Sequence, residues 1–362
     1  MRVIAKIHEE TWESLLFRSI TTPRDLPEIL KPVKKEDLEK IAQTYPMRIN
    51  PYTLSLIKKK NDPFYKQAVP DPREFTDQRG FDDPLNEEGL SPVPGLTHHY
   101  PDRVLFLVSS QCPMYCRFCN RKRKVGHPSM VTRETMREGI AYIRKTRKVR
   151  DVLLSGGDPL LLSDKELYRI LTELRSISHV EIIRIGTRVP CTLPQRVTPE
   201  LANLLRGFHP LFINTHFNHP DEITPEAALA CNRLADAGVP LGCQTVLLKG
   251  VNDRGRIIRK LMQKLLTVRV RPYYLFQADQ AKGTAHFWTH LNKGLDIISS
   301  LQGHTTGLCV PHFAVDLPGG GGKVNLVPPA VIEKEGKILI RNYLGKGYEW
   351  DIEEVPKMPK VR

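Results

Sequence analysis

The chain has 362 residues, of which 40% are hydrophobic and 26% charged, so it is long enough to bury a large core. No stretch approaches the run of about 20 apolar residues that a membrane-spanning helix needs. The N-terminal sequence MRVIAKIHEETWESLLF is too charged for a signal peptide. We therefore predict a cytoplasmic protein that has no membrane partner.

The net charge of +14 can indicate nucleic acid binding. Four consecutive cations occupy residues 121–124, and a second basic group occupies 144–150 at the end of a predicted helix, where cations complement the helix dipole. Basic and aromatic residues do not alternate as they do in proteins that bind single strands. An iron–sulfur or nucleic-acid-binding module without catalysis is thus kept only as the alternative class.

Residues 1–95 contain two segments with helical spacing, TWESLLFRS and KKEDLEKIAQTY, between charged runs and prolines. Neither segment carries a catalytic set of residues. We predict that 1–95 form an N-terminal helical region that packs against the rest of the chain or acts as an oligomerisation arm. A homo-oligomer is the expected assembly.

From residue 104 onward, short apolar strands alternate with amphipathic helices, which is typical of parallel β/α units. The predicted strands are 104–110, 151–157, 181–187, 211–217, 241–247 and 270–277. Helix starts are marked by a capping box at Ser163 and Glu166 and by the pairs Thr198-Pro199 and Thr224-Pro225. This pattern predicts an α/β fold with six parallel units.

Unusual polar residues lie in each of these strands or just after it. They are Cys112, Cys116 and Cys119 after the first strand, Gly156, Gly157 and Asp158 after the second, Arg188 after the third, then His216, Gln244 and Asp279. A β/α barrel builds its active site at the carboxyl ends of its strands. Each residue alone has an alternative as a loop cap or a satisfied buried polar group, but the set predicts one site.

The three cysteines have the spacing Cys-x3-Cys-x2-Cys, within QCPMYCRFCNRKRK. Three thiolates leave one iron of a four-iron cluster without a protein ligand, which favours a cluster that binds a small molecule. Structural zinc normally needs four ligands, and the nearest extra one is His127. The other four cysteines are scattered singly, as in reduced proteins, and are predicted to be small buried hydrophobes.

A run of four glycines, 319–322, ends in Lys323. The run is not a phosphate-binding P-loop, because Val324 stands where that motif needs serine or threonine. Lys323 is a candidate for the amine that bonds pyridoxal phosphate (PLP), and a flexible turn is the alternative.

The cysteine motif resembles that of the radical S-adenosylmethionine (SAM) superfamily. In addition, LSGGDPLL, RIGTRVPCTLPQRVT, NTHFNHPDEIT, GCQTVLLKGVND, RPYYLFQAD and VDLPGGGGK resemble the lysine 2,3-aminomutase family, in that family's order over about 100–328. The resemblance implies a partial (β/α)6 radical SAM barrel at 96–305, an N-terminal helical extension at 1–95 and a C-terminal segment at 306–362 that carries the PLP lysine.

The resemblance also implies the cofactors and the site residues. The cofactors are a [4Fe-4S] cluster, SAM and PLP, and an electron-donor protein is an implied partner. The implied residues are Cys112, Cys116 and Cys119 for the cluster; Lys323, Arg103 and Tyr100 for PLP; Arg121, Asp279 and Asp316 for the substrate; and Gly156, Gly157, Asp158, Arg188, His216 and Gln244 for SAM.

The implied activity is an isomerase that interconverts L-lysine and β-lysine by a 1,2-amino shift, driven by a 5′-deoxyadenosyl radical on a PLP aldimine. A relative acting on a protein-bound lysine of a translation factor, or on arginine or glutamate, is the alternative. The chain lacks the cysteines that bind zinc between subunits in well-known members: Arg254 follows the VND turn, and no cysteine follows Cys309. We therefore predict no zinc.

Overall fold

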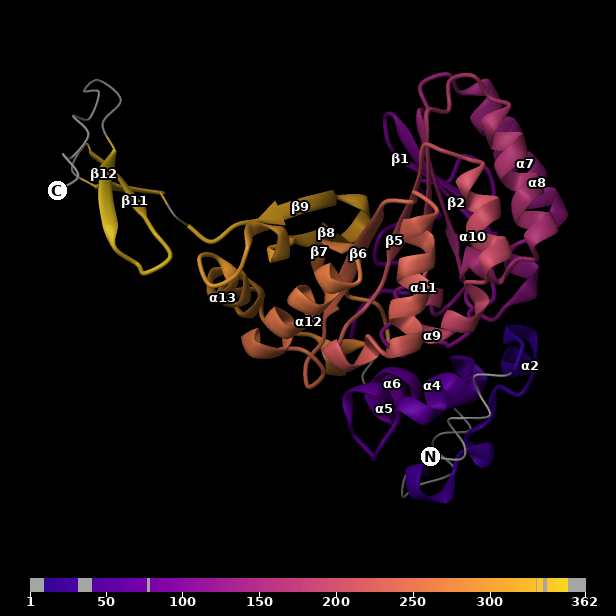
Figure 1. Ribbon diagram of the computed structural model, residues 1–362, viewed down its shortest axis with the longest axis horizontal. Coiled ribbons are helices and arrows are strands. Elements are labelled where there is room, and N and C mark those ends of the chain that lie inside the picture. Colours follow the sequence, from indigo (N-terminus) through magenta and orange to yellow (C-terminus); the bar gives the residue numbers. More distant parts are fainter. Residues whose placement is uncertain (1–9, 32–40, 77–78, 330, 335–336, 351–362) are drawn as a thin grey trace.

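The computed structural model describes residues 10–31, 41–76, 79–329, 331–334 and 337–350. Its centre is one nine-stranded sheet with strands in the order β1 to β9, surrounded by helices (Figure 1). In the described ranges, no helix has the length and apolar character required to span a membrane.

The predicted strands are present as β2 to β7. They are β2 Arg103–Ser109, β3 Asp151–Gly156, β4 Ile182–Gly186, β5 Leu211–Thr215, β6 Leu241–Leu247 and β7 Val270–Gln277. All of these strands are parallel, so the predicted α/β fold is confirmed. The sheet also continues beyond the prediction, with β8 His312–Leu317 parallel to β7 and with two antiparallel strands, β1 Leu96–Tyr100 and β9 Gly322–Leu326.

The register of the strands aligns their apolar residues in rows. Phe106 pairs with Leu154, Leu154 with Ile185, and Ile185 with Ile213, and all four side chains are fully buried. Alternate residues of a strand point to opposite faces, so this row faces the covering helices while the other face is free for polar groups. The main core lies between the sheet and these helices.

The covering helices are α7 Arg133–Lys145, α8 Asp164–Arg175, α10 Pro199–Arg206, α11 Pro225–Asp236, α12 Gly255–Thr267 and α13 Leu291–Leu301, with the short α9 Val189–Thr192 after β4. The predicted helix starts are confirmed: Ser163, Thr198 and Thr224 each accept a hydrogen bond from a backbone N–H three residues later. Short 3-10 turns cover 128–130, 159–161, 194–196, 220–222, 285–287, 307–309 and 318–320.

The two edges of the nine-stranded sheet approach each other. The backbone N–H of Lys323 on β9 donates to the hydroxyl of Tyr100 on β1 over 2.9 Å. Gly322 is essential there, because a Cβ at this position would lie 3.1 Å from His99 Nε2 and its φ is +85°. The sheet is therefore a nearly closed barrel, and the chain segments near residues 100 and 323 share one site.

An N-terminal layer covers the carboxyl ends of the strands (Figure 1). It comprises α2 Trp12–Phe17, α4 Pro51–Leu56, α5 Pro63–Ala68 and α6 Arg73–Thr76, with 3-10 turns at 23–25 and 28–30. Residues 41–44 are also helical, whereas the rest of the predicted helix KKEDLEKIAQTY up to residue 40 lies outside the described residues. Asn50 ties the layer to the barrel by donating to the carbonyl of Thr192 over 2.8 Å.

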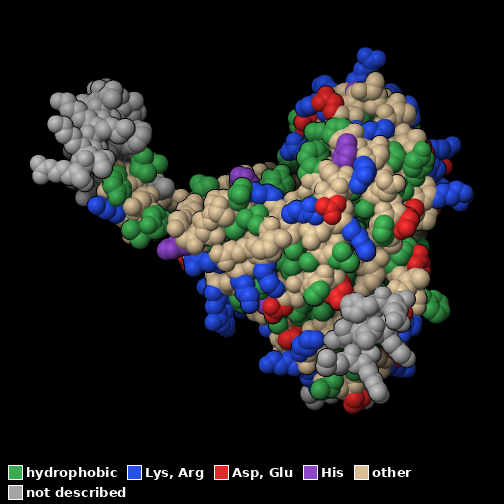
Figure 2. Space-filling model, viewed as in Figure 1, with side chains coloured by type: hydrophobic (Ala, Val, Ile, Leu, Met, Phe, Trp, Pro, Cys, Tyr) green, Lys and Arg blue, Asp and Glu red, His purple; other side chains and the backbone are tan. Residues whose placement is uncertain are grey.

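A second small sheet follows the barrel and projects away from it (Figure 1). Its strands are β10 Val331–Lys334, β11 Lys337–Arg341 and β12 Gly347–Trp350, all antiparallel. Apolar side chains are exposed on and beside it, including Val327, Tyr343 and Leu344 (Figure 2). The domain boundaries stay a prediction, although the barrel sheet itself runs through β8 and β9, past residue 305.

Candidate active site

The cysteine loop, residues 112–124, leaves the end of β2 and lies between the barrel and the N-terminal layer. Charges at Cys116 and Cys119 act on the Cys112 thiol, so the three cysteines, which are half-buried, lie close together. Burial raises the pKa of Cys112 well above its usual value and that of Cys119 to about 11. Thiols in this setting ionise when a metal binds. In the described ranges, no three His, Cys, Asp or Glu side chains are placed to hold a single metal ion.

The two glycines at the end of β3, Gly156 and Gly157, fix the start of the cysteine loop. The N–H of Gly157 donates to the carbonyl of Ser109 over 2.6 Å, and the N–H of Asp158 donates to the carbonyl of Gln111 over 2.7 Å. A Cβ on Gly156 would lie 2.1 Å from the Ser109 carbonyl oxygen, and one on Gly157 2.4 Å from that of Gln111. Only glycine permits this approach, so their observed contacts are to the protein backbone.

Asp158 is buried and caps the turn that follows β3. Its carboxylate accepts from the backbone N–H groups of Leu160 and Arg188, over 3.1 and 2.7 Å, and from the hydroxyl of Thr187 over 2.7 Å. Burial raises its pKa, and these hydrogen bonds oppose the rise. The observed function of Asp158 is thus to join the ends of β3 and β4, and its role in binding SAM stays a prediction.

Arg188 connects the end of β4 to the cysteine loop. Its Nη1 donates to Cys116 Sγ over 2.9 Å, and its guanidinium lies 5.2 Å from the centre of the Phe118 ring. His216 lies beside the same ring, at 5.6 Å between ring centres. Burial and the nearby Arg188 charge lower the pKa of His216 to about 3, so its imidazole is neutral.

Lys323 lies directly opposite Asp316 in the antiparallel pair of β8 and β9. Opposite residues point to the same face, and Lys323 Nζ is accordingly 2.8 Å from Asp316 Oδ2. The ammonium also lies 3.9 Å from the centre of the Phe276 ring and 5.1 Å from that of Tyr274, both on β7. The glycine run therefore leads into a strand rather than a flexible turn.

Arg103 and Tyr100, the predicted PLP residues, lie near Lys323. The Arg103 guanidinium lies 3.9 Å from the centre of the Tyr100 ring, whose hydroxyl accepts from the Lys323 N–H. Arg103 is 41% exposed and pairs with Asp102 at 2.9 Å. His99, beside Gly322, has a buried Nδ1 without a hydrogen-bond partner. A cation, a lysine amine and an unsatisfied ring nitrogen in one place fit an anionic, polar cofactor such as PLP.

Asp279, just beyond β7, joins the cysteine loop to the lysine. Its Oδ2 accepts a hydrogen bond over 2.7 Å from Nδ2 of Asn120, the residue that follows the last cysteine of the motif. Burial and the negative charge of Asp316 raise the pKa of Asp279 to about 7, while Lys323 and Arg121 lower it. Asp279 therefore lies within electrostatic reach of Asp316, Lys323 and Arg121, and the substrate-binding roles of these residues stay a prediction.

Arg121 is held by Glu87, a residue that the sequence did not single out. Arg121 Nε donates to Glu87 Oε1 over 2.7 Å, and its Nη1 lies 3.4 Å from Ser155 Oγ. Burial would lower the pKa of Arg121, but the charge and hydrogen bond of Glu87, together with the charges of Cys119 and Asp279, outweigh burial and raise this pKa. The other oxygen of Glu87, Oε2, is buried without a hydrogen bond, and Lys124 Nζ is 3.7 Å away.

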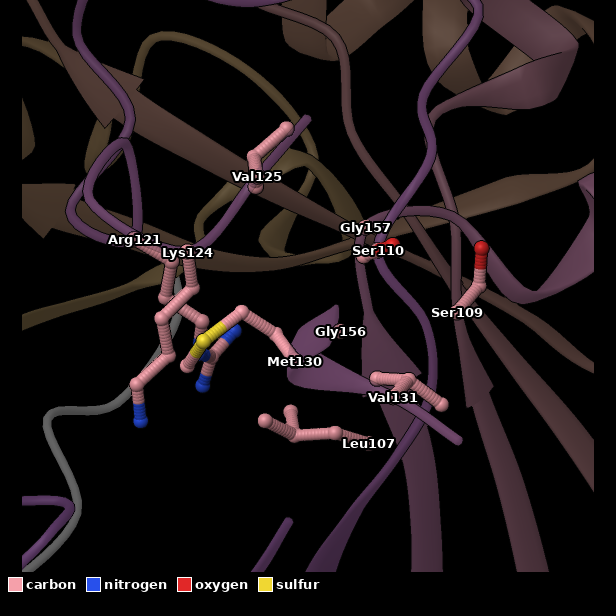
Figure 3. A pocket seen from close by; sticks show the side chains of 10 residues that line it. All are labelled: Leu107, Ser109, Ser110, Arg121, Lys124, Val125, Met130, Val131, Gly156 and Gly157. Atoms are coloured by element: carbon pink, nitrogen blue, oxygen red, sulfur yellow. The ribbon is translucent and has the colours of Figure 1, made fainter. Parts of the chain in front are cut away.

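A hollow with about 210 Å³ of empty space, open solvent included, adjoins this arginine (Figure 3). Arg121 and Lys124 lie side by side on one flank, and Ser109, Ser110, Gly156 and Gly157 lie opposite them at the ends of β2 and β3 (Figure 3). Leu107, Val125, Met130 and Val131 complete the lining, so only the end of the hollow beside the two cations is suited to a carboxylate.

Further unsatisfied polar atoms lie at the ends of the central strands. Arg188 Nε, Asn214 Nδ2 and Thr215 Oγ1 are buried without a hydrogen-bond partner in the part of the chain that the structure describes. Buried polar groups are nearly always paired, so these atoms fit a polar ligand such as SAM. Gln244 is half-buried on β6, where the register shifts, and its role stays a prediction.

The sequence prediction missed Glu74, Gln67, Glu87 and Glu222, which pair with the predicted cations. All but Glu222 lie in the N-terminal region, far in sequence from their partners, and no motif marks them. Asn120 could have been found, because it directly follows Cys119 in the cysteine motif.

The fold and the cysteine loop define a class, which comparison with known proteins supports. A family model of the radical SAM superfamily matches residues 106–261, and one described as lysine-2,3-aminomutase matches residues 298–350. The protein is thus a radical SAM enzyme with a nearly closed α/β barrel.

Relatives narrow this class. The L-lysine 2,3-aminomutase of Methanococcus maripaludis is 53% identical, over 86% of this chain and 73% of that protein. That of Clostridium subterminale is 51% identical, over 92% and 82%, and the glutamate 2,3-aminomutase of Clostridioides difficile is 41% identical, over 98% and 86%. The chain belongs to the lysine 2,3-aminomutase family. The prediction of an isomerase of the radical SAM aminomutase type is therefore confirmed.

Proposed function

We propose that the protein is an L-lysine 2,3-aminomutase that interconverts L-lysine and β-lysine by moving an amino group between adjacent carbons. The observation that carries this proposal is the pair of carboxylates, Asp279 and Asp316, which act on each other beside Lys323. A substrate with a side-chain ammonium neutralises such a pair. A substrate with a side-chain carboxylate adds a third negative charge.

Arg121 binds the α-carboxylate of the substrate in this proposal. Glu87 engages Nε and Nη2, which leaves Nη1 directed toward the barrel beside Ser155. A guanidinium oriented in this way grips a carboxylate with little loss of freedom on binding. The amino acid then lies with its carboxylate near the cysteine loop and its side chain toward Asp279 and Asp316.

Asp316 and Asp279 respond to the charge of the substrate. Asp316 pairs with Lys323 at 2.8 Å in this structure, and a substrate ammonium would be a second cationic partner for its carboxylate. Asp279 has a pKa raised to about 7, so below pH 7 it is mostly neutral. An arriving ammonium favours its ionised form and completes the recognition of lysine.

The cofactor-binding residues follow the predicted assignment. Cys112, Cys116 and Cys119 would hold a [4Fe-4S] cluster; Lys323, with Arg103 and Tyr100, would hold PLP; and Gly156, Gly157, Asp158, Arg188, His216 and Gln244 would line SAM. When bound, the cluster and SAM supply a radical that takes a substrate hydrogen, and PLP supplies a carrier for the migrating nitrogen. The chain orients these groups and excludes water, and the neutral His216 can accept or donate a hydrogen bond without adding charge beside Arg188.

The remaining parts of the proposal concern partners. An electron-donor protein would reduce the cluster, the enzyme would act in the cytoplasm as a homo-oligomer, and no zinc would be needed. The zinc statement rests on the missing cysteines alone.

The test is to incubate anaerobically reconstituted, reduced enzyme with SAM, PLP and one amino acid at a time. We expect β-lysine from L-lysine, detected by NMR, and no product from glutamate. Parallel reactions with arginine and with a lysine-containing translation factor test the alternatives. Turnover of glutamate, or no turnover of free lysine by enzyme that cleaves SAM, would overturn the proposal.

A further inference from the structure

The N-terminal layer contacts the main chain of the cysteine loop at successive residues. Arg48 Nη1 donates to the Cys112 carbonyl over 3.2 Å, and Asn50 Nδ2 donates to the Pro113 carbonyl over 3.0 Å. Ile49 and Met114 form an antiparallel bridge, and the Tyr115 N–H donates to the Arg48 carbonyl over 3.1 Å. Residues 48–50 of the layer thus run beside the cysteine loop and pair with it as a short antiparallel strand would.

Further along the loop, Glu74 of α6 binds two cations at once. Its carboxylate is 2.6 Å from Arg117 Nη2 and 2.8 Å from Lys122 Nζ, and its side chain is fully buried. Arg117 stands between the second and third cysteines, and Lys122 stands three residues after the third. One carboxylate from the N-terminal layer therefore fixes the loop on both sides of Cys119.

The remaining donors of these two cations are also used. Arg117 Nη1 donates to the Pro46 carbonyl over 2.9 Å, and Lys122 Nζ lies 3.2 Å from the carbonyls of Arg117 and Gly283. Burial alone would raise the pKa of Glu74, but Arg117 and Lys122 outweigh it and the pKa is lowered. Removing the Glu74 charge would leave two cations, Arg117 and Lys122, buried without their anionic partner, which is strongly destabilising. The loop conformation therefore depends strongly on Glu74.

Gln67 of α5 supports the second cysteine. Its carbonyl accepts from the Arg117 N–H over 2.9 Å, and its side-chain oxygen accepts from Arg188 Nη2 over 2.7 Å. Arg188 in turn donates to Cys116 Sγ over 2.9 Å. Glu222 accepts from both Arg188 and Gln67, which completes the network.

These contacts bring the N-terminal layer to the main chain and the cations of the loop, and none of those made by the layer itself ends on a cysteine sulfur atom. The N-terminal groups bind main-chain carbonyls and N–H groups of the loop and the side chains of Arg117 and Lys122, on either side of Cys119. A hollow with about 230 Å³ of empty space, open solvent included, has Tyr45, Pro46, Cys116 and Cys119 among its lining residues. Nearly every residue from 112 to 117 has a hydrogen-bond or ion-pair partner. Apolar packing of the layer against the barrel would not require so many polar contacts to one loop.

We propose that residues 45–76 form a cradle that shapes the cysteine loop before iron binds, with Glu74 as its central positioning residue. The cradle gives an otherwise irregular loop its partners in the iron-free protein. A cluster then forms on thiols that are already oriented. This assignment concerns the loop, and it holds whichever amino acid is the substrate.

The test compares Glu74→Gln with the wild type. The amide keeps the shape but removes the charge that binds Arg117 and Lys122. In the iron-free protein we expect amide hydrogen exchange in residues 112–124 to be faster by about a hundredfold, with strands β3 to β6 unchanged. After anaerobic reconstitution, we expect iron and sulfide per chain to fall at least about threefold.

Two further variants separate positioning from general stability. Glu74→Asp, which keeps the charge, is expected to restore most of the iron content. Arg48→Met removes only the donor to the Cys112 carbonyl and is expected to have a smaller effect in the same direction, so the test survives if Glu74→Gln does not fold.

The matched control is Asp164→Asn. Asp164 pairs with the buried Arg196 at 2.6 Å, on the helical side of the barrel. We expect this variant to retain wild-type iron content and wild-type exchange in 112–124. Normal iron content and normal loop exchange in Glu74→Gln would overturn the proposal, and so would an equal loss in the Asp164→Asn control.

Discussion

The two ends of the active site are built differently. At the cluster end, Glu74 and Arg117 are almost fully buried, and the N-terminal layer supplies their polar partners. At the lysine end, Lys323 and Asp316 are 26% and 21% exposed, and Arg103 is 41% exposed. A cluster is assembled once and then protected, whereas the lysine end must admit substrate and release product at each turnover. The contrast teaches that one active site can be buried where it holds a permanent cofactor and partly exposed where substrate and product exchange.

Removing Lys323 should have the largest effect, because it disables the lysine end of the site and leaves the cluster end intact. We expect Lys323→Ala to abolish turnover and the visible absorbance of bound PLP, because no other amine takes its place on β9. The cluster end should be unaffected, so cluster absorbance and iron content should equal those of the wild type. Spectra before and after borohydride report both ends, and loss of iron in this variant would contradict their independence.

Replacing Asp279 with asparagine should have the next largest effect. Without the charge, the substrate ammonium loses a buried partner, and we expect kcat/KM for lysine to fall by about a hundredfold. The hydrogen bond from Asn120 can remain, since the amide oxygen still accepts it. Steady-state assays with lysine measure the loss. A decrease below about threefold would mean that Asp316 alone recognises the ammonium.

The same substitution should stabilise the protein at alkaline pH. The pKa of Asp279 is about 7 in the folded protein and 3.8 for an unperturbed carboxyl group, so the folded state binds the extra proton between these values. This stabilisation is complete below about pH 4 and is lost as pH rises through 7. Cofactor-free Asp279→Asn should therefore unfold at a higher temperature than the wild type at pH 8, and the difference should shrink at pH 5. Calorimetry at both pH values measures it.

The sequence predicted the parts of the fold that depend on local pattern. The strands β2 to β7 follow from apolar runs, and the caps at Ser163, Thr198 and Thr224 follow from turn chemistry. The strands β8 and β9 were missed because glycines between them resemble a flexible loop. Their pairing becomes visible only when β8 is placed beside β7, which is a tertiary effect.

Sequence motifs mark the cations and thiols of the candidate site but not the acids that hold the cations. Arg121 and Lys122 stand in a recognisable motif, whereas their partners Glu87 and Glu74 lie 34 and 48 residues earlier. Such pairs depend on how the N-terminal layer folds back onto the barrel. A single sequence carries no periodic signal for this arrangement.

Glu87 tests the region between the cluster end and the lysine end of the active site, because it orients Arg121 there. We expect Glu87→Gln to raise KM for lysine about tenfold, since Arg121 loses a charge-assisted partner, and to change kcat less. The pKa of Glu87 is lowered, burial being outweighed by Arg121, so the effect should be constant from pH 6 to 9. The split between KM and kcat is the measurement, and a loss confined to kcat would contradict a positioning role.

The smallest expected effect belongs to Tyr100, which links the two edges of the barrel. Tyr100→Phe removes the acceptor for the Lys323 N–H but keeps the ring beneath Arg103. A neutral hydrogen bond contributes about 1 kcal/mol, so PLP affinity should weaken about fivefold while iron content stays constant. Tyr100→Ala also removes the ring and should weaken PLP binding further. Titration of PLP by absorbance distinguishes the two variants. If both variants bound PLP equally, the hydroxyl rather than the ring would carry the whole contribution, and Arg103 would be held by Asp102 alone.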